Sequence, residues 1–182
     1  MTVNPLIKLT VAAAAAWLTL AGSTSYAAPG QSKGAGGWEP SADHMESIVI
    51  AIKTDPLVDP EPACVALQIG INLLMDTIPV QGNYFSVTRA DEVTLFPTIG
   101  GVELINPDND LALAQPVCDT PAGPSSGSLA ELLQGFVNLG GEVVVCPLCA
   151  TRRGITEPTY GIMGNGVDIH NLFLEGDKVI DF

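Results

Sequence analysis

The sequence predicts an α/β fold in which an open, mostly parallel sheet carries helices on both faces. Short runs of β-branched residues, such as 47–52, are typical of strands that are buried on both faces of a parallel sheet. Between those runs lie stretches with apolar residues at helical spacing. Strands that alternate with helices along a chain favour parallel pairing through helical crossovers.

The N-terminal residues are expected to be a targeting segment that is removed from the mature protein. Lys8 precedes the mostly apolar run 9–21, and Ser25-Tyr26-Ala27 supplies the small residues that a signal peptidase reads. Residues 1–27 are therefore predicted to be a signal peptide, and the apolar run is short of the ~20 residues that a spanning helix needs. The protein is expected to be periplasmic or secreted, with no membrane attachment after cleavage.

The rest of the chain is long enough for one domain. Residues 28–45 are rich in Gly, Ser and Pro and are predicted to be a flexible linker, so that the α/β domain spans 46–182. Seven Lys and Arg stand against 20 Asp and Glu, a formal net charge of −13. Because nucleic-acid binders must neutralise phosphates, this charge argues against a nucleic-acid partner.

The first half of the domain predicts a strand, a helix and a second strand. The strand at 47–52 is followed by an apolar helix at 63–75 and by a strand at 93–96, which Pro97 and a Gly-Gly turn close. The connection at 77–91 is longer than the ~2–6 residues usual there. We expect it to hold an extra hairpin or a lid.

The next helix has the strongest sequence signal in the chain. Ser128 and Glu131 have the spacing of a capping box, leucines and Phe136 follow on one face, and Gly140-Gly141 ends the helix. The preceding segment 106–127 is rich in Pro, Gly and Ser and is predicted to be a loop.

The C-terminal part predicts two further strands and a short helix. Residues 142–146 include three consecutive valines, so this third strand is expected to lie centrally in the sheet. Glycines at 161–166 resemble a phosphate-binding loop only superficially and are interpreted as a turn. A short helix at 168–174 and a terminal strand at 178–182 complete the domain.

The candidate working group is the thiol of Cys146. It follows the third strand, at the carboxyl edge where open α/β sheets bind their ligands. If a helix begins at Pro147, its free amides would stabilise a thiolate. Arg152 and Arg153 could add positive potential.

Four short motifs along 47–182 together carry a family resemblance. They are an Asp-Pro loop after the first strand, Val93-Thr94-Leu95-Phe96 with Gly101-Val102, Val145-Cys146 leading to Arg153-Gly154-Ile155, and Gly176-Asp177-Lys178-Val179-Ile180 before Phe182. In order and spacing they resemble the DsrE/DsrF-like sulfur-relay family.

This resemblance implies a flavodoxin-like, three-layer sandwich that assembles into homotrimers or hexamers. It also implies that the Cys after the third strand carries sulfur as a persulfide, a role that falls on Cys146 alone. The chain departs from the family pattern in its predicted export, in its 77–91 insertion, and in Cys149, which creates a Cys-x-x-Cys motif. These departures argue against a cytoplasmic relay to tRNA modification or sulfite reductase.

The four cysteines allow three pairings, which leaves other interpretations of Cys146 open. In an oxidising compartment the preferred pairing is Cys146 with Cys149 and Cys64 with Cys118, and Cys146 would then be structural. An inert buried thiol is a further alternative. A zinc site lacks a second suitably spaced pair, and a thioredoxin fold would place its Cys-x-x-Cys after an early strand.

Two hypotheses on function follow. The first is a sulfur-transfer or thiol-redox protein in which Cys146 is the acceptor nucleophile and Cys149 resolves the intermediate, with a sulfur donor or acceptor protein, or a small thiol, as its partner. The second is a non-catalytic module of the same fold that binds a small ligand or a protein. No cofactor or metal is expected, and His44 and His170 are interpreted as surface or capping residues.

Overall fold

A computed structural model of the chain describes residues 46–182 except residue 81. The described residues belong to one compact unit. The predicted signal peptide, the linker at 28–45 and His44 lie outside the described residues.

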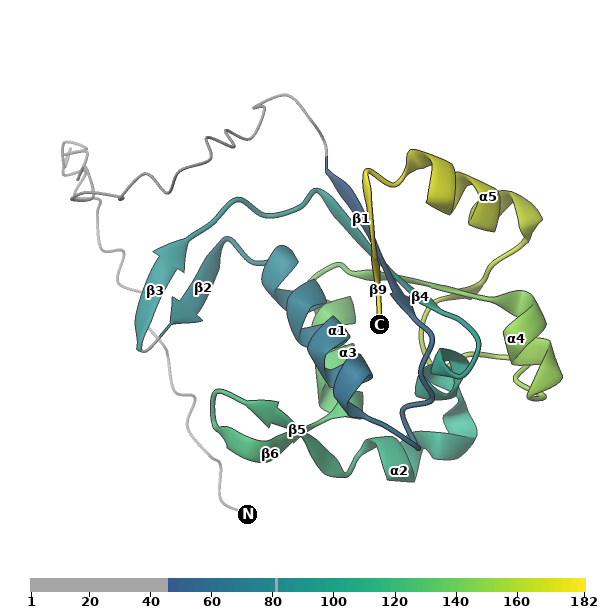
Figure 1. Cartoon of the computed structure of the whole chain (residues 1–182), viewed down its shortest axis with the longest axis horizontal. Coiled ribbons are helices and arrows are strands. Elements are labelled where there is room, and N and C mark those ends of the chain that lie inside the picture. Colours follow the sequence, from purple (N-terminus) through teal and green to yellow (C-terminus); the bar gives the residue numbers. More distant parts are fainter. Residues whose placement is uncertain (1–45, 81) are drawn as a thin grey trace, which may run out of the picture. The chain divides into compact units, whose positions relative to one another are not determined.

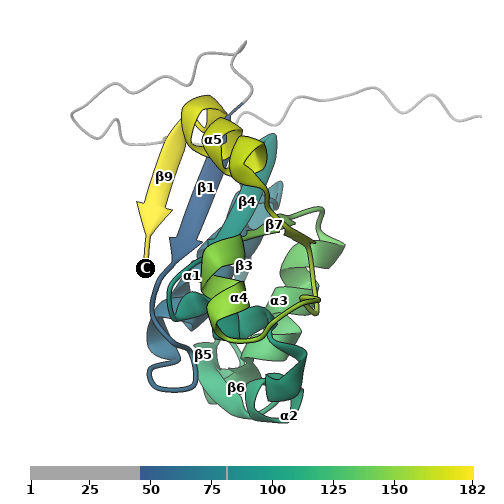
Figure 2. The ribbon, with the colours of Figure 1, turned by 90° about the vertical axis from the view of Figure 1, so that its right-hand side faces the viewer.

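Five parallel strands form the central sheet, in the order β8-β7-β4-β1-β9 (Figure 2). The strands are β1 (Ser47–Ile52), β4 (Glu92–Pro97), β7 (Glu142–Val145), β8 (Ile162–Met163) and β9 (Lys178–Asp181). This is the open parallel sheet of a flavodoxin-like sandwich, as predicted. The predicted third strand, β7, is an inner strand but not the central one, because β4 lies between it and β1.

Helices cover both faces of the sheet. In Figure 1, α1 (Glu61–Leu73) and α3 (Leu129–Asn138) lie on one side, and α4 (Pro147–Arg152) and α5 (Gly166–Glu175) lie on the other. The larger core forms under α1 and α3, where alternate residues of the strands meet the buried faces of both helices. A smaller core of Val49, Ala51 and Phe96 packs against α5. The three layers follow from strands that are apolar on both faces.

The contact between α1 and α3 depends on glycine. The ring of Phe136 is fully buried and lies so close to Gly70 that a Cβ there would come within 2.9 Å of it. The predicted capping box at the start of α3 is present, with both the Ser128 and the Glu131 hydrogen bond formed. At the other end Gly140, with φ of 94°, ends the helix in the left-handed conformation that glycine adopts most readily.

The insertion at 77–91 is a hairpin. It consists of β2 (Thr77–Val80) and β3 (Asn83–Ser86), which pair antiparallel in a separate two-stranded sheet. The side chains of Tyr84 and Phe85 are exposed.

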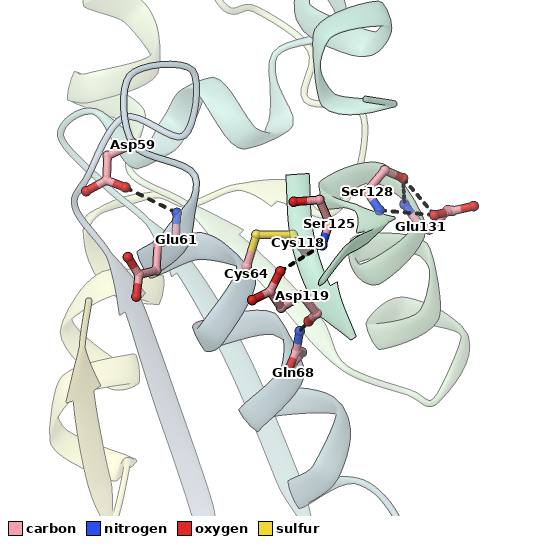
Figure 3. Close-up of a disulfide and its surroundings, with 9 residues drawn as sticks. All are labelled: Asp59, Glu61, Cys64, Gln68, Cys118, Asp119, Ser125, Ser128 and Glu131. Atoms are coloured by element: carbon pink, nitrogen blue, oxygen red, sulfur yellow. Dashed lines mark hydrogen bonds between the residues drawn. A yellow bond between two sulfur atoms is a disulfide. The ribbon is translucent and has the colours of Figure 1, made fainter. Parts of the chain in front are cut away.

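The prediction that 106–127 is a loop was wrong. The segment holds the short 3-10 turn η2 (Pro107–Asn109), the helical turn α2 (Asp110–Leu113), and a second hairpin of β5 (Pro116–Thr120) and β6 (Gly123–Ser128). A further 3-10 turn, η1 (Gly101–Ile105), lies just before it. The hairpin has no alternating apolar pattern because most of its side chains face water. A disulfide bond between Cys64 in α1 and Cys118 in β5 attaches it to the core (Figure 3).

The interpretation of 161–166 as a turn was also incomplete, because it contains the two-residue edge strand β8. Two residues give too short a pattern for a strand to be predicted. Gly161 precedes the strand with φ of 83°, and a Cβ there would lie 2.2 Å from the carbonyl oxygen of Val143. Only glycine lets the chain approach β7 this closely.

Among the described residues, no helix has the length and apolar character to cross a membrane.

Candidate functional site

Cys146 lies at the carboxyl edge of the sheet, directly after β7. Its backbone amide donates a hydrogen bond to the carbonyl oxygen of Pro97 at 3.1 Å, which joins the end of β7 to the end of β4. Cys146 is the N-cap residue of α4, and Pro147 begins that helix. The side chain is half-buried and contacts the cores on both faces of the sheet.

Cys149 follows one turn later in α4, so both thiols lie on the same side of the helix. The two Sγ atoms are 2.8 Å apart, and the Cys146 thiol is placed to donate a hydrogen bond to the Cys149 sulfur. Both cysteines are free and half-buried. A disulfide bond is about 2.05 Å long, so small side-chain movements would join these sulfurs. The site can therefore exist as a dithiol or as a disulfide.

The loop after β4 supplies further polar groups to Cys149. The Thr98 hydroxyl oxygen lies 3.5 Å from the Cys149 sulfur, and the backbone amide of Ile99 donates a hydrogen bond to it. Ile99 has φ of 51°, an uncommon conformation for a β-branched residue. It occupies the first central position of a turn that the Gly101 amide closes onto the Thr98 carbonyl oxygen at 2.8 Å. Glycine is the usual residue at a first central position with positive φ.

These contacts change the acidity of one thiol. Burial raises the pKa of Cys149, but the hydrogen bonds from the Cys146 thiol, the Thr98 hydroxyl and the Ile99 amide outweigh that effect. The positive charge of Arg153 adds a smaller contribution in the same direction. The net result is a pKa below the ordinary value of 9.0, so more of Cys149 is thiolate at neutral pH.

Arg153 is held in place by an ion pair that crosses to η1. Its Nε lies 3.1 Å from a carboxylate oxygen of Glu103, and its Nη1 donates to the Cys149 carbonyl oxygen at 3.4 Å. Glu103 in turn accepts hydrogen bonds from the side-chain amides of Asn106 and Asn109. The guanidinium is thus fixed at the end of α4, near the thiols.

A cleft of about 820 Å³ lies at the opposite, amino edge of the sheet. Its lining is rich in carboxylates, several of which have structural partners. Asp91 accepts from the Glu46 amide, Asp177 accepts from the Ser47 amide, and Asp168 caps α5. These three carboxylates therefore support the ends of strands and of a helix, and the cysteines lie at the other edge of the sheet.

One comparison with known proteins identifies the family, and a second shows a similar fold. The sequence profile of the DsrE/DsrF-like family matches residues 68–182, which is more than half of the chain. The chain belongs to the DsrE/DsrF-like family. The crystal structure of the ychN protein from E. coli is similar to this chain with a TM-score of 0.51 and 20% sequence identity, over 76% of this chain and 100% of that one. A search of the curated proteins finds no match.

The four cysteines fall into two separate pairs in this DsrE-like fold. Cys146 and Cys149 lie together at the predicted edge of the sheet as free thiols, which differs from the disulfide that the preferred pairing gave them. Cys64 and Cys118 form a disulfide bond. His170 lies exposed in α5, and among the described residues no group of His, Cys, Asp and Glu could hold a metal ion.

Sequence reasoning missed the contribution of Thr98 and Ile99. The signal was available in part, because a strand that ends near a Gly-Gly turn was predicted at 93–96. The sequence did not give the strand order. The loop after β4 reaches Cys149 only because β4 and β7 are neighbours in the sheet. Arg153 was named for its charge, but its reach depends on Glu103 in η1, within a segment whose structure no sequence pattern indicated.

Proposed function

We propose that this DsrE-like protein is exported and handles sulfur through the Cys146–Cys149 pair, as a carrier of persulfide sulfur or as a thiol-disulfide exchange protein. The observation that supports this proposal is the pair of free, half-buried thiols 2.8 Å apart at the carboxyl edge of the sheet. Open α/β folds bind their ligands at this edge. Family membership supports sulfur as the cargo.

The reaction needs a sulfur donor, a sulfur acceptor and no protein group beyond the two thiols. A thiolate of the pair attacks the outer sulfur of a donor persulfide, a new S–S bond forms, and the donor leaves as a thiolate. An acceptor thiolate then attacks the same outer sulfur and restores the protein thiolate. The net transfer of a sulfur atom consumes neither oxidant nor reductant.

Loading with a small persulfide tests this proposal. The protein, with Cys146 and Cys149 reduced, is incubated with glutathione persulfide and its intact mass is measured before and after addition of an acceptor thiol. We expect a mass gain of one sulfur atom that maps to the peptide containing both cysteines and that the acceptor removes. The double variant Cys146→Ser with Cys149→Ser is the matched control and should gain no sulfur.

A protein that keeps its mass under these conditions would argue against sulfur handling. The alternative, a binding module of the same fold, would then be favoured if the double serine variant captured a partner as well as the native protein does.

A further inference from the structure

We propose that Cys149, rather than Cys146, is the attacking sulfur of the pair, and that the turn at Thr98 and Ile99 holds the negative charge on it. This inference rests on the proposed function. It departs from the family resemblance, which assigns the sulfur-carrying role to Cys146.

The directions of the hydrogen bonds distinguish the two sulfurs. Cys146 donates its thiol proton to Cys149 at 2.8 Å, and the sulfur that accepts a proton is the one suited to carry charge. When Cys149 is a thiolate it has no proton of its own, so the Thr98 hydroxyl at 3.5 Å must be the donor in that contact. The Ile99 amide is a third donor. Three donors therefore converge on one sulfur, and its lowered pKa agrees with this arrangement.

The turn that carries two of these donors is held rigidly by β1. The Thr98 amide donates to the Ile52 carbonyl oxygen at 2.9 Å, and the Gly100 amide donates to the Lys53 carbonyl oxygen at 3.0 Å. At Gly101 the backbone comes so close to β1 that a Cβ would lie 2.1 Å from the Ile52 oxygen. These contacts fix the amide of Ile99 in place before any sulfur donor arrives.

The positive φ of Ile99 places backbone strain in the same turn. A β-branched residue with φ of 51° is strained, and such residues persist only where the surrounding structure fixes them. Strained residues cluster at functional sites. Here the strained peptide is the one whose amide points at the Cys149 sulfur.

The two thiols then have different parts in the transfer. The Cys149 thiolate attacks the outer sulfur of the donor persulfide, and the donor thiolate leaves. The Cys146 thiol donates a hydrogen bond to the Cys149 sulfur while that sulfur is charged. If no acceptor arrives, the Cys146 thiol passes its proton to the outer sulfur of the Cys149 persulfide and its own sulfur attacks the inner sulfur. The Cys146–Cys149 disulfide forms, and the outer sulfur leaves as hydrosulfide. A small dithiol reductant returns the pair to the reduced state.

A matched pair of single variants tests this assignment. Serine can replace Cys146 as a proton donor, so Cys146→Ser should still gain one sulfur from glutathione persulfide, whereas Cys149→Ser should lose most of its loading. The reverse pattern would overturn the assignment. Loss of loading in both variants would also overturn it, because neither thiol would then act alone.

A second measurement keeps the assignment testable even if the native protein accepts no sulfur. The rate of alkylation by iodoacetamide is followed against pH in both single variants. The remaining thiol of Cys146→Ser should react at lower pH than the remaining thiol of Cys149→Ser. Equal profiles would refute the inference, while failed loading of the native protein refutes only the proposed function.

A substitution of Thr98 tests the role of the turn. Thr98→Val keeps the shape of the side chain and removes the hydroxyl, so alkylation of Cys149 at neutral pH should fall by roughly tenfold, as expected for a hydrogen bond to a charged group. The difference should shrink at high pH, where the thiol ionises without help, and Thr98→Ser should restore the native profile. An unchanged pH profile in Thr98→Val would overturn the role of the turn.

Discussion

The two cysteine pairs of this protein differ in almost everything except their chemistry. Cys64 and Cys118 are 54 residues apart in sequence, only 5% and 1% exposed, and joined by a disulfide bond. Cys146 and Cys149 are three residues apart, half-buried and free. The first pair attaches a polar hairpin to a helix, whereas the second pair lies at the end of a strand, where several polar groups meet.

The surroundings of each pair explain the difference. Around the disulfide, two of the hydrogen bonds drawn in Figure 3 hold the hairpin: Ser125 donates to Asp119 within it, and Gln68 of α1 donates to the Asp119 carbonyl oxygen. Around Cys149, hydrogen bonds and a guanidinium favour the charged form of the sulfur. A cysteine pair is thus structural or reactive according to the polar groups that its neighbours direct at the sulfur atoms.

Removal of the disulfide should have the largest effect on stability. The double variant Cys64→Ala with Cys118→Ala opens a loop of 54 residues, and the chain-entropy relation puts the loss in the free energy of unfolding at about 4 kcal/mol. Urea unfolding measures this loss. The matched control, Cys146→Ser with Cys149→Ser, should change stability by less than about 1 kcal/mol. Similar losses in both double variants would remove the distinction between the pairs.

A smaller effect is expected from the helix that follows the disulfide-bonded hairpin. Ser128→Ala removes the side chain that caps α3 and accepts from the Glu131 amide at 3.2 Å. Caps of this kind contribute about 1 kcal/mol, so the free energy of unfolding measured in urea should fall by about that amount. Alkylation of Cys149 should keep its native rate, because the cap belongs to the structural region. A change in that rate would show that the two regions are coupled.

The smallest effect is a pH dependence of stability that belongs to the reactive pair. Because the pKa of Cys149 is lowered in the folded protein, the folded state loses this proton at a lower pH than the unfolded chain does. Between the lowered pKa and 9.0 the unfolded chain binds more protons, so stability rises with pH in that window and is lost as pH falls through the folded pKa.

Urea unfolding of the reduced protein in oxygen-free buffer, from neutral pH to pH 9, measures this slope against Cys149→Ser. The native protein should gain stability relative to the variant as pH rises. A constant difference between the two proteins would contradict the lowered pKa.

The sequence was sufficient where a local pattern carries the structure. The β-branched run of β1 and the capping box of α3 were both recognised, and so was the position of Cys146 after a strand. Each of these depends on burial or capping within a few residues. The family could be suspected because four such local motifs occur in order along the chain.

The parts that sequence reasoning missed depend on contacts between distant residues. The hairpin of β5 and β6 is attached by Cys118 to a helix 54 residues earlier, and its own composition is that of a loop. The donors to Cys149 come from Thr98 and Ile99, 51 and 50 residues before it, and reach it only because β4 is the neighbour of β7. The lowered pKa of Cys149 could not be predicted without that strand order.

The strand order also sets when the sheet can be completed. β1 is the first strand of the described chain, yet one of its two neighbours is β9, so Val49 pairs with Val179 across 130 positions of the sequence. Contacts of such long range form late, because loop-closure entropy must be paid before they contribute. Until residues 178–181 have paired, one edge of β1 stays open to pairing with other chains. The central sheet is therefore completed at the strand that the described chain forms first, and β9 is the element that shields this edge of β1 from other chains.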